Sequence, residues 1–444
     1  MRAKLMMAAL LATGSAFAAH GWQAQPAPRY APRNDAPIAV RETPALPAVQ
    51  TLFDGYVADR KMPGIVAAIG HGDAPPAFAF AGGISLDPGA PRAGPETLWR
   101  VYSMTKPITG MAAMMLVEDG RLKLDQPLSD LFPGFARMRV LTSPDTSLDS
   151  VPAKTPITIR MLLTHSAGLS YSISAKGPLL KELERLGITP GAINAASEVQ
   201  ARPARPASLQ DFAARVATVP LIAEPGTKWS YSIGLDVAAA VVEKVSGMSF
   251  ERFVQTRIFD PLKMRSSYWT VPASEVGRLA DNYAFVGPNM IPFDPAKTSV
   301  YLQRPNFPYG GAGLVMSARD YDRFLHMLAN EGSLDGIRVM KPATVRLAMS
   351  NLLPAGVTFA GLGGGTGGDM ANAMGFGAGG SVYLRDVPGG ASKGTYGWGG
   401  AAGTIAWVDP VRKLRGTVMV NYFPADKWPI RADVVKALYA DGRR

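Results

Sequence analysis

Two patterns of apolar positions along the chain, helical spacing and short apolar runs, predict helices and strands respectively. Helical spacing, with apolar residues three and four positions apart, marks residues 48–61, 104–120 and 427–442. Short apolar runs bounded by Pro and Gly mark residues 64–86 and 403–423. Each of these two segments predicts a pair of strands joined by a turn.

The centre of the chain, from about 121 to 290, has mostly helical and loop patterns, and strand character returns from about 300. Strand-rich ends around a helical middle indicate an α/β domain with a helical insertion, rather than alternating βαβ units. We therefore predict an α/β domain formed by residues 45–120 and 291–444, and a mostly helical domain formed by residues 121–290. We find no internal repeat.

The N-terminus has the pattern of an export signal. Arg2 and Lys4 precede an apolar run, and Ala16-Phe17-Ala18 supplies the small-x-small pattern of a cleavage site. The alternative is a membrane anchor, but the run is short for a span of about 20 residues. We predict a signal peptide over residues 1–18, a Pro/Ala-rich lead over 19–44, and a periplasmic or secreted protein with no stable membrane span after cleavage.

Composition removes several classes of function. The 444 residues include no cysteine, which excludes disulfides, thiolate zinc sites and a cysteine nucleophile. The net charge of +11 comes from scattered arginines and lysines, without a basic run or a basic-aromatic stripe, so we predict no nucleic-acid partner. The glycine-rich segment 361–380 lacks the phosphate-loop pattern and reads as a surface loop.

The strongest chemical signal is Ser103, which lies three positions before Lys106 in "SMTK". Residues at this spacing share one face of a helix. Pro107 fits only in a first turn, so the helix is expected to begin near Ser103, where the helix dipole favours negative charge. Ser103 is also the sole serine followed by lysine at this spacing. The alternative without catalysis is that Lys106 is a surface lysine one turn beyond a serine at the helix N-terminus.

A lysine is a poor base by default, because its ordinary pKa is about 10.4. Lowering that pKa to near 7 requires about 4 kcal/mol from burial and neighbouring charge. Alternatively, Lys106 stays charged and favours the ionised form of a neighbouring tyrosine. The residues by themselves leave both mechanisms open.

Several blocks resemble the serine β-lactamase and penicillin-binding-protein superfamily, in the order expected for it. They are residues 98–135, 157–171, 224–264, 310–332 and 396–410. The resemblance is closest to class C β-lactamases and to the family VIII carboxylesterases. It implies an antiparallel sheet flanked by helices and built from both chain ends, with an inserted helical domain.

The resemblance also implies roles for individual residues. Ser103 would be the acylated nucleophile, Lys106 its proton partner, and Tyr231 the first residue of the second motif, Tyr231-Ser232-Ile233. The lactamases carry asparagine at the third position of this motif. Ile233 cannot hydrogen-bond a substrate amide, which weakens the case for lactam binding.

The third motif points further toward esters. Where lactamases carry K-T-G, the matching block has Trp398-Gly399-Gly400, as in the esterases. Indole offers an apolar wall without the charge that holds a carboxylate, and the two glycines allow an acyl group to approach the backbone closely. The N–H groups of Ser103 and Ala401 would form the oxyanion hole.

Other motifs are weaker candidates. Ser129-Asp130 lacks the asparagine of S-D-N, Lys393 lies upstream of the matching strand, and Ser166 lacks the leading glycine of a nucleophile elbow. His165 stands beside Ser166, but adjacent side chains seldom aim at one point, so we predict a structural role. His71 and His326 have no metal-ligand spacing.

We conclude from the sequence that the protein is an exported serine hydrolase, most consistent with a carboxylesterase of short-chain or small neutral esters. No cofactor and no metal are implied. The rivals are a β-lactamase or D-amino-acid peptidase, and a non-catalytic binding protein on the same fold.

Overall fold

The computed structural model describes residues 46–191, 193–359, 361 and 373–441. These residues belong to one compact unit, Glu42–Arg444. The predicted signal peptide and the Pro/Ala-rich lead lie outside the described residues, as does much of the glycine-rich segment. The division of the unit into an α/β domain and a helical domain stays a prediction.

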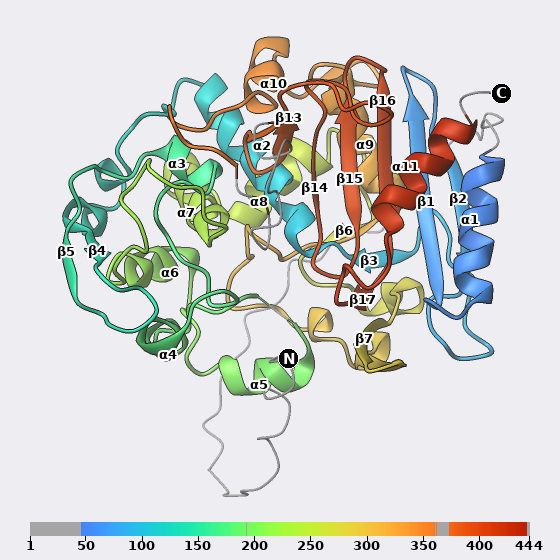
Figure 1. Ribbon diagram of the computed structural model, residues 1–444, viewed down its shortest axis with the longest axis horizontal. Coiled ribbons are helices and arrows are strands. Elements are labelled where there is room, and N and C mark those ends of the chain that lie inside the picture. Colours follow the sequence, from blue (N-terminus) through green and yellow to red (C-terminus); the bar gives the residue numbers. More distant parts are fainter. Residues whose placement is uncertain (1–45, 192, 360, 362–372, 442–444) are drawn as a thin grey trace, which may run out of the picture. The chain divides into compact units, whose positions relative to one another are not determined.

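A seven-stranded antiparallel sheet is the centre of the α/β part, in the order β12-β13-β14-β15-β16-β1-β2 (Figure 1). Strands β1 and β2 come from the N-terminal part of the chain, and the other five strands come from its C-terminal part. This confirms the predicted construction of the sheet from both chain ends. The strands are β1 Gly64–His71, β2 Ala77–Gly82, β12 Met374–Phe376, β13 Ser381–Tyr383, β14 Tyr396–Gly399, β15 Ile405–Asp409 and β16 Leu414–Met419.

Helices cover both faces of this sheet. On one face, α1 Pro47–Ala58 and α11 Ile430–Asp441 pack against each other and the sheet; on the other lie α2 Thr105–Glu118 and α9 Ala318–Ala329. Strand β1 is accordingly apolar on both sides: Ile65 packs toward α1, whereas Val66 packs toward α2 and α9. Because both faces are covered, the strand reads as a continuous apolar run.

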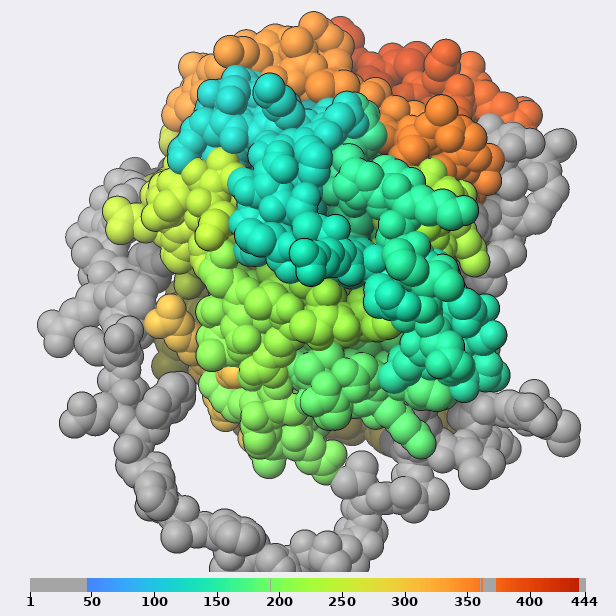
Figure 2. Space-filling model, turned by 90° about the vertical axis from the view of Figure 1, so that its left-hand side faces the viewer, coloured from blue at the N-terminus to red at the C-terminus, as the bar shows by residue number. Residues whose placement is uncertain are grey.

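The helical part follows α2 in the chain and forms the side of the unit that faces the viewer in Figure 2, in cyan to yellow-green. Its helices are α3 Ile159–Leu163, α4 Gly177–Arg185, α5 Ala195–Ala201, α6 Leu209–Val216, α7 Gly234–Ser246 and α8 Phe250–Val254, with α10 Pro342–Ala348 later in the chain. None of the helices in the described residues has the length and apolar character that a membrane span requires.

The other strands of the described residues form four small sheets. They are β3 Leu98–Arg100, β9 Val315–Ser317 and β6 Ser267–Tyr268; β17 Tyr422–Phe423, β7 Asn282–Val286 and β8 Asn289–Asp294; β4 Arg139–Leu141 and β5 Ser150–Pro152; and β10 Ser333–Leu334 and β11 Ile337–Arg338. The first of these sheets matters most for the site, because β3 runs directly into the segment that carries Ser103.

Helix α2 is buried on every side, since residues from Thr105 to Leu116 are all inaccessible to solvent. Such a helix needs apolar residues all round, as "GMAAMMLVE" provides. A Cβ at Gly110 would collide with the carbonyl of Ala378, so glycine lets the loop after β12 approach the helix closely. Lys106 is therefore held in the interior by the packing of a whole helix.

A buried ion pair fixes the strand that leads to Ser103. The guanidinium of Arg100 donates to Asp294 Oδ2 at 2.6 Å, to the Asp294 carbonyl at 2.8 Å and to Ser299 Oγ at 3.0 Å. Both charged side chains are at most 1% exposed. Removing one partner of such a pair leaves the other as an uncompensated buried charge.

We therefore expect Asp294→Ala to lower the free energy of unfolding by about 3–5 kcal/mol. Asp125→Ala is the matched control, because the Arg160–Asp125 pair is exposed and should contribute at most about 1 kcal/mol. Denaturant unfolding of both variants measures the difference. Equal, small losses would mean that the Arg100 network does not stabilise this strand.

Candidate active site

Ser103 lies in a 3-10 turn, Tyr102–Met104, which leads into α2 at Thr105. The sequence predicted a helix that begins near Ser103, and the structure refines this to one tight turn before the α-helix. The N-terminus of α2 directs the positive end of the helix dipole toward an anion that forms at Ser103.

Three side chains meet at the serine oxygen. Tyr231 Oη lies 2.7 Å from Ser103 Oγ, and Lys106 Nζ lies 3.2 Å from the same atom. Lys106 Nζ also lies 4.7 Å from the centre of the Tyr231 ring. Ser103 and Tyr231 are half-buried, and Lys106 is completely buried. A hydroxyl in contact with a phenol and an amine has partners that can remove and return its proton.

The residue before the nucleophile adopts a rare backbone conformation. Tyr102 has φ +43°, in the left-handed region that a bulky side chain seldom occupies. Its hydroxyl accepts a hydrogen bond from Asn282 Nδ2 at 2.8 Å, and its ring packs edge-on against Phe423. These contacts hold the strained residue that directs Ser103 toward Tyr231.

His165 is a packing partner of Tyr231. Its ring centre lies 4.8 Å from that of Tyr231. Its Nδ1 accepts the Ser232 N–H at 3.2 Å and lies 3.0 Å from Ser232 Oγ. Burial, with the nearby charge of Lys106, holds the pKa of His165 well below its usual range, so the imidazole stays neutral. These contacts support the structural role predicted for it.

Trp398 lies in an aromatic group that extends from Tyr231. Its ring centre is 5.8 Å from that of Tyr231, and it packs against Phe359 and Phe376 together with Trp229. The indole is 9% exposed, and its N–H has no hydrogen-bond partner among the described residues. The structure thus puts an apolar wall beside the phenol.

The end of β14 packs against the backbone that leads to Ser103. A Cβ at Gly400 would lie 2.5 Å from the Val101 carbonyl, so this approach requires glycine. The turn after β14 is closed by hydrogen bonds from Gly400 N–H to Thr404 O at 2.7 Å and from Gly403 N–H to Gly400 O at 3.2 Å. Within the described residues, the Ala401 N–H on this turn donates to no main-chain carbonyl.

The remaining sequence candidates lie elsewhere or are occupied. Ile233 is 4% exposed and belongs to the main hydrophobic core, so its side chain is packed away from solvent. Ser166 Oγ is buried and lies 2.9 Å from Thr164 Oγ1. Ser129 belongs to a separate 3-10 turn, Leu128–Asp130. Lys393 lies in the loop between β13 and β14.

Two residues of the site were not identified from the sequence. The carbonyl of Gly311 accepts a hydrogen bond from Lys106 Nζ at 2.6 Å, and the Gly311 N–H donates to Asp236 Oδ1 at 2.8 Å. Asp236 could have been noticed as a single acidic residue within the apolar stretch "GLDVAAAVV". Nothing in the local pattern, however, connects it with a lysine 130 positions earlier.

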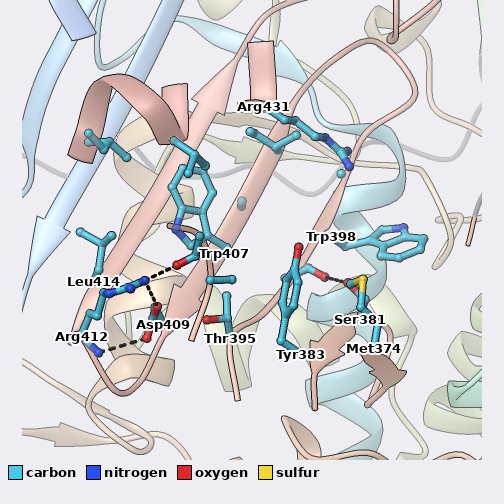
Figure 3. Close-up of a pocket in the computed structure, with 18 of the residues that line it drawn as sticks. Met374, Ser381, Tyr383, Thr395, Trp398, Trp407, Asp409, Arg412, Leu414 and Arg431 are labelled. Carbon is cyan, nitrogen blue, oxygen red and sulfur yellow. Dashed lines mark hydrogen bonds and ion pairs between the residues drawn. The ribbon is translucent and has the colours of Figure 1, made fainter. Parts of the chain in front are cut away.

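A cavity of about 740 Å³ lies beside Trp398 (Figure 3). Its lining includes Trp398 and Gly399 of β14, Trp407 of β15, and Arg431 of α11. Figure 3 shows Arg431 extending from α11 toward β14; a Cβ at Gly399 would collide with its guanidinium. Ser103 is not among the lining residues; Trp398 and Phe359 line the cavity and also belong to the aromatic group around Tyr231.

Comparison with known proteins places this geometry in a family. The Beta-lactamase family model matches residues 49–440. Lovastatin esterase of Penicillium rubens is 33% identical over 346 residues, which cover 71% of this chain and 77% of that protein. Protein Rv1367c of Mycobacterium tuberculosis is 31% identical over 345 residues, with 76% and 80% covered.

A solved structure agrees with this assignment. EstCE1, described as a hydrolase with promiscuous acyltransferase activity, has a TM-score of 0.71 and 25% identity, covering 88% of this chain and 98% of its own. The chain therefore belongs to the Beta-lactamase family and is a serine hydrolase with the β-lactamase fold.

Proposed function

We propose that this serine hydrolase is an exported carboxylesterase, which forms an acyl-enzyme at Ser103 and acts on short-chain or small neutral esters. The observation that carries the proposal is the contact of Ser103 Oγ with both Tyr231 Oη and Lys106 Nζ. Export rests on the signal pattern of residues 1–18, and it implies a periplasmic or secreted enzyme.

The reaction proceeds in two steps. Tyr231, with Lys106 beside it, accepts the Ser103 proton while Ser103 Oγ bonds to the acyl carbon of the ester. The bond from that carbon to the alcohol oxygen breaks, and Tyr231 returns the proton to the leaving alkoxide. Water then gives a proton to Tyr231 while its oxygen bonds to the acyl carbon. The bond from that carbon to Ser103 Oγ breaks, the acid is released, and Tyr231 returns the proton to Ser103 Oγ. The steps require neither a metal nor a cofactor.

Charge develops on the acyl oxygen in both steps. The N–H groups of Ser103 and Ala401 are the proposed oxyanion hole. Each such donor contributes about 2.7–4 kcal/mol to the transition state. Two observations support this assignment: the close packing of Gly400 on Val101, and the Ala401 N–H, which donates to no main-chain carbonyl among the described residues.

The side chains around the serine favour esters over lactams. Trp398 offers an apolar surface where carboxylate-binding relatives place a cation, and the buried Ile233 offers no hydrogen bond to an amide. The similarity to lovastatin esterase and to EstCE1 supports ester substrates. A β-lactamase or D-amino-acid peptidase remains the rival enzyme. A non-catalytic binding protein is the second rival.

Ser103→Ala should abolish both ester hydrolysis and covalent labelling by a fluorophosphonate probe, while the melting temperature stays close to that of the wild type. The reason is that only the nucleophilic oxygen is lost from a half-buried side chain. Mass spectrometry of the labelled wild type locates the modified residue. Labelling at another serine would contradict the assignment, and no labelling at all would favour a binding protein.

Tyr231→Phe should lower kcat by about 10²–10⁴-fold, which is the usual contribution of a general base. Phenylalanine keeps the ring, so its contacts with Trp398 and His165 should persist and the melting temperature should change little. The measurement is kcat and kcat/KM across pH for both proteins. A variant within about threefold of the wild type at every pH would exclude Tyr231 as the base.

Trp398→Lys should raise the ratio of lactam to ester turnover, because it introduces a cation beside the phenol where Trp398 now presents an apolar face. Rates on p-nitrophenyl butyrate and nitrocefin, measured side by side, give the ratio. Trp398→Phe is the control, since it removes the indole without adding charge. If the lysine variant leaves the ratio unchanged, Trp398 does not select the substrate.

A further inference from the structure

Asp236 is a buried carboxyl that the reaction described above does not use. It lies in the first turn of α7 and is 5% exposed. Burial raises its pKa above the ordinary value, and the charge of Lys106 and hydrogen bonds from the N–H groups of Gly311 and of Asp236 itself offset only part of this effect. The groups that lower the pKa all favour the carboxylate form.

A single residue, Gly311, links this carboxyl to the lysine of the site. The Gly311 N–H donates to Asp236 Oδ1 at 2.8 Å, while its carbonyl accepts from Lys106 Nζ at 2.6 Å. A Cβ at position 311 would lie 2.6 Å from Asp236 Oδ2, so only glycine allows this approach. The preceding carbonyl, of Gly310, accepts from Thr109 Oγ1 at 2.6 Å. The loop is therefore held from both α2 and α7.

Lys106 requires a nearby negative charge, because a buried ammonium is costly without one. Its direct neighbours are Ser103 Oγ, the Gly311 carbonyl and the ring faces of Tyr231 and Tyr171. None of these neighbours is a carboxylate. Lys106 interacts electrostatically with the carboxyl of Asp236, and Gly311 lies between the two side chains.

Apart from Tyr231, which takes up and gives back the proton during the reaction, the titratable groups around this pair do not supply a fixed negative charge. Burial and Lys106 lower the pKa of His165, which stays neutral. Burial raises the pKa of Tyr171 well above its usual value, and Asp236 adds to this effect. Burial likewise raises the pKa of Tyr309, with a further contribution from Asp236.

We propose that Asp236 is a positioning residue for the Ser103 reaction: through Gly311 it holds Lys106 in place as an ammonium, so that Tyr231 alone accepts the serine proton. This inference rests on the proposed function. Lys106 then keeps its three protons throughout. The Ser103 proton moves to Tyr231 Oη and passes to the leaving alkoxide; Tyr231 then takes a proton from water and returns it to Ser103 Oγ as the acyl-enzyme is cleaved. Of the two mechanisms that the sequence leaves open, this selects the one with a charged lysine.

Asp236→Asn tests the proposal, since asparagine can keep an oxygen acceptor for the Gly311 N–H and removes only the charge. Without the negative charge of Asp236, the Lys106–Tyr231 pair loses each of its protons at a lower pH. When the pair holds a single shared proton, that proton is found on Lys106 a smaller fraction of the time. We therefore expect the acidic and the alkaline limb of the plot of kcat/KM against pH to move to lower pH. The plateau should fall about 10-fold for each 1.4 kcal/mol by which the ammonium form is disfavoured.

Thr109→Val is the matched control, because it removes a hydrogen bond to the same loop without changing charge. Its plateau is expected to fall without movement of the limbs. If the limbs of Asp236→Asn coincide with those of the wild type, the residue is merely structural and the proposal is overturned, however far the rate falls.

A double-mutant cycle gives a readout that does not depend on activity. In Lys106→Met the buried Asp236 loses its counterion, and its pKa rises further. The folded state then binds the Asp236 proton more tightly than the unfolded chain, so stability falls as pH rises above the unfolded value of about 3.9. Lys106→Met/Asp236→Asn should recover stability at pH 8 and lose this pH dependence.

The outcomes separate the two proposals. Additive stability losses in the cycle would overturn the role of Asp236, even in an active esterase. A wild type that neither hydrolyses esters nor is labelled at Ser103 would overturn the proposed function and, with it, the positioning role. Non-additive losses with shifted limbs are the result expected if both are correct.

Discussion

The burial of Lys106 is the constraint on which the rest of the site depends. A side chain that is 0% exposed can carry charge only if oxygen atoms, ring faces and a countercharge replace water around it. Here the Gly311 carbonyl and the ring of Tyr231 surround the nitrogen, and the carboxyl of Asp236 lies behind Gly311. Helix α2 supplies the lysine and α7 supplies the aspartate, so the α/β part and the helical part meet at this point. Stability and reactivity thus draw on the same contacts.

Ser103 is positioned from the opposite side, by the strand and turn before it. Arg100 is fixed by Asp294, and the left-handed Tyr102 is held by Asn282 through its hydroxyl. The strained residue is tolerated because the surrounding network determines its conformation. The nucleophile therefore has two independent supports: a polar network before it in the chain, and the lysine one turn after it.

Local patterns predicted much of this architecture and the centre of its site. Short apolar runs bounded by Pro and Gly predicted the strand pairs β1–β2 and β15–β16, and the i, i+3 spacing put Ser103 and Lys106 together, since both depend on neighbours in the chain. The sequence did not identify Asp236, which acts on Lys106 through a loop at position 311. Nor did it predict that Ile233 is buried in the core, because exposure at a helix start depends on packing against distant elements. The cavity beside Trp398 likewise depends on how β14, β15 and α11 come together.

One charge also explains why a tyrosine, and not the nearby histidine, is suited to be the base. The ring centres of His165 and Tyr231 lie 4.8 Å apart in a tilted arrangement, and both side chains lie close to Lys106. An ammonium disfavours a second cation, so an imidazole beside it is a weak proton acceptor. The same ammonium stabilises an anion, so a phenol beside it can lose its proton and accept another in turn. In the proposed mechanism, a lysine that stays charged leaves a neutral histidine to pack the site and a tyrosine to move the proton. That division of roles requires a fixed negative charge near Lys106. Asp236, on the far side of Gly311, is in a position to supply it.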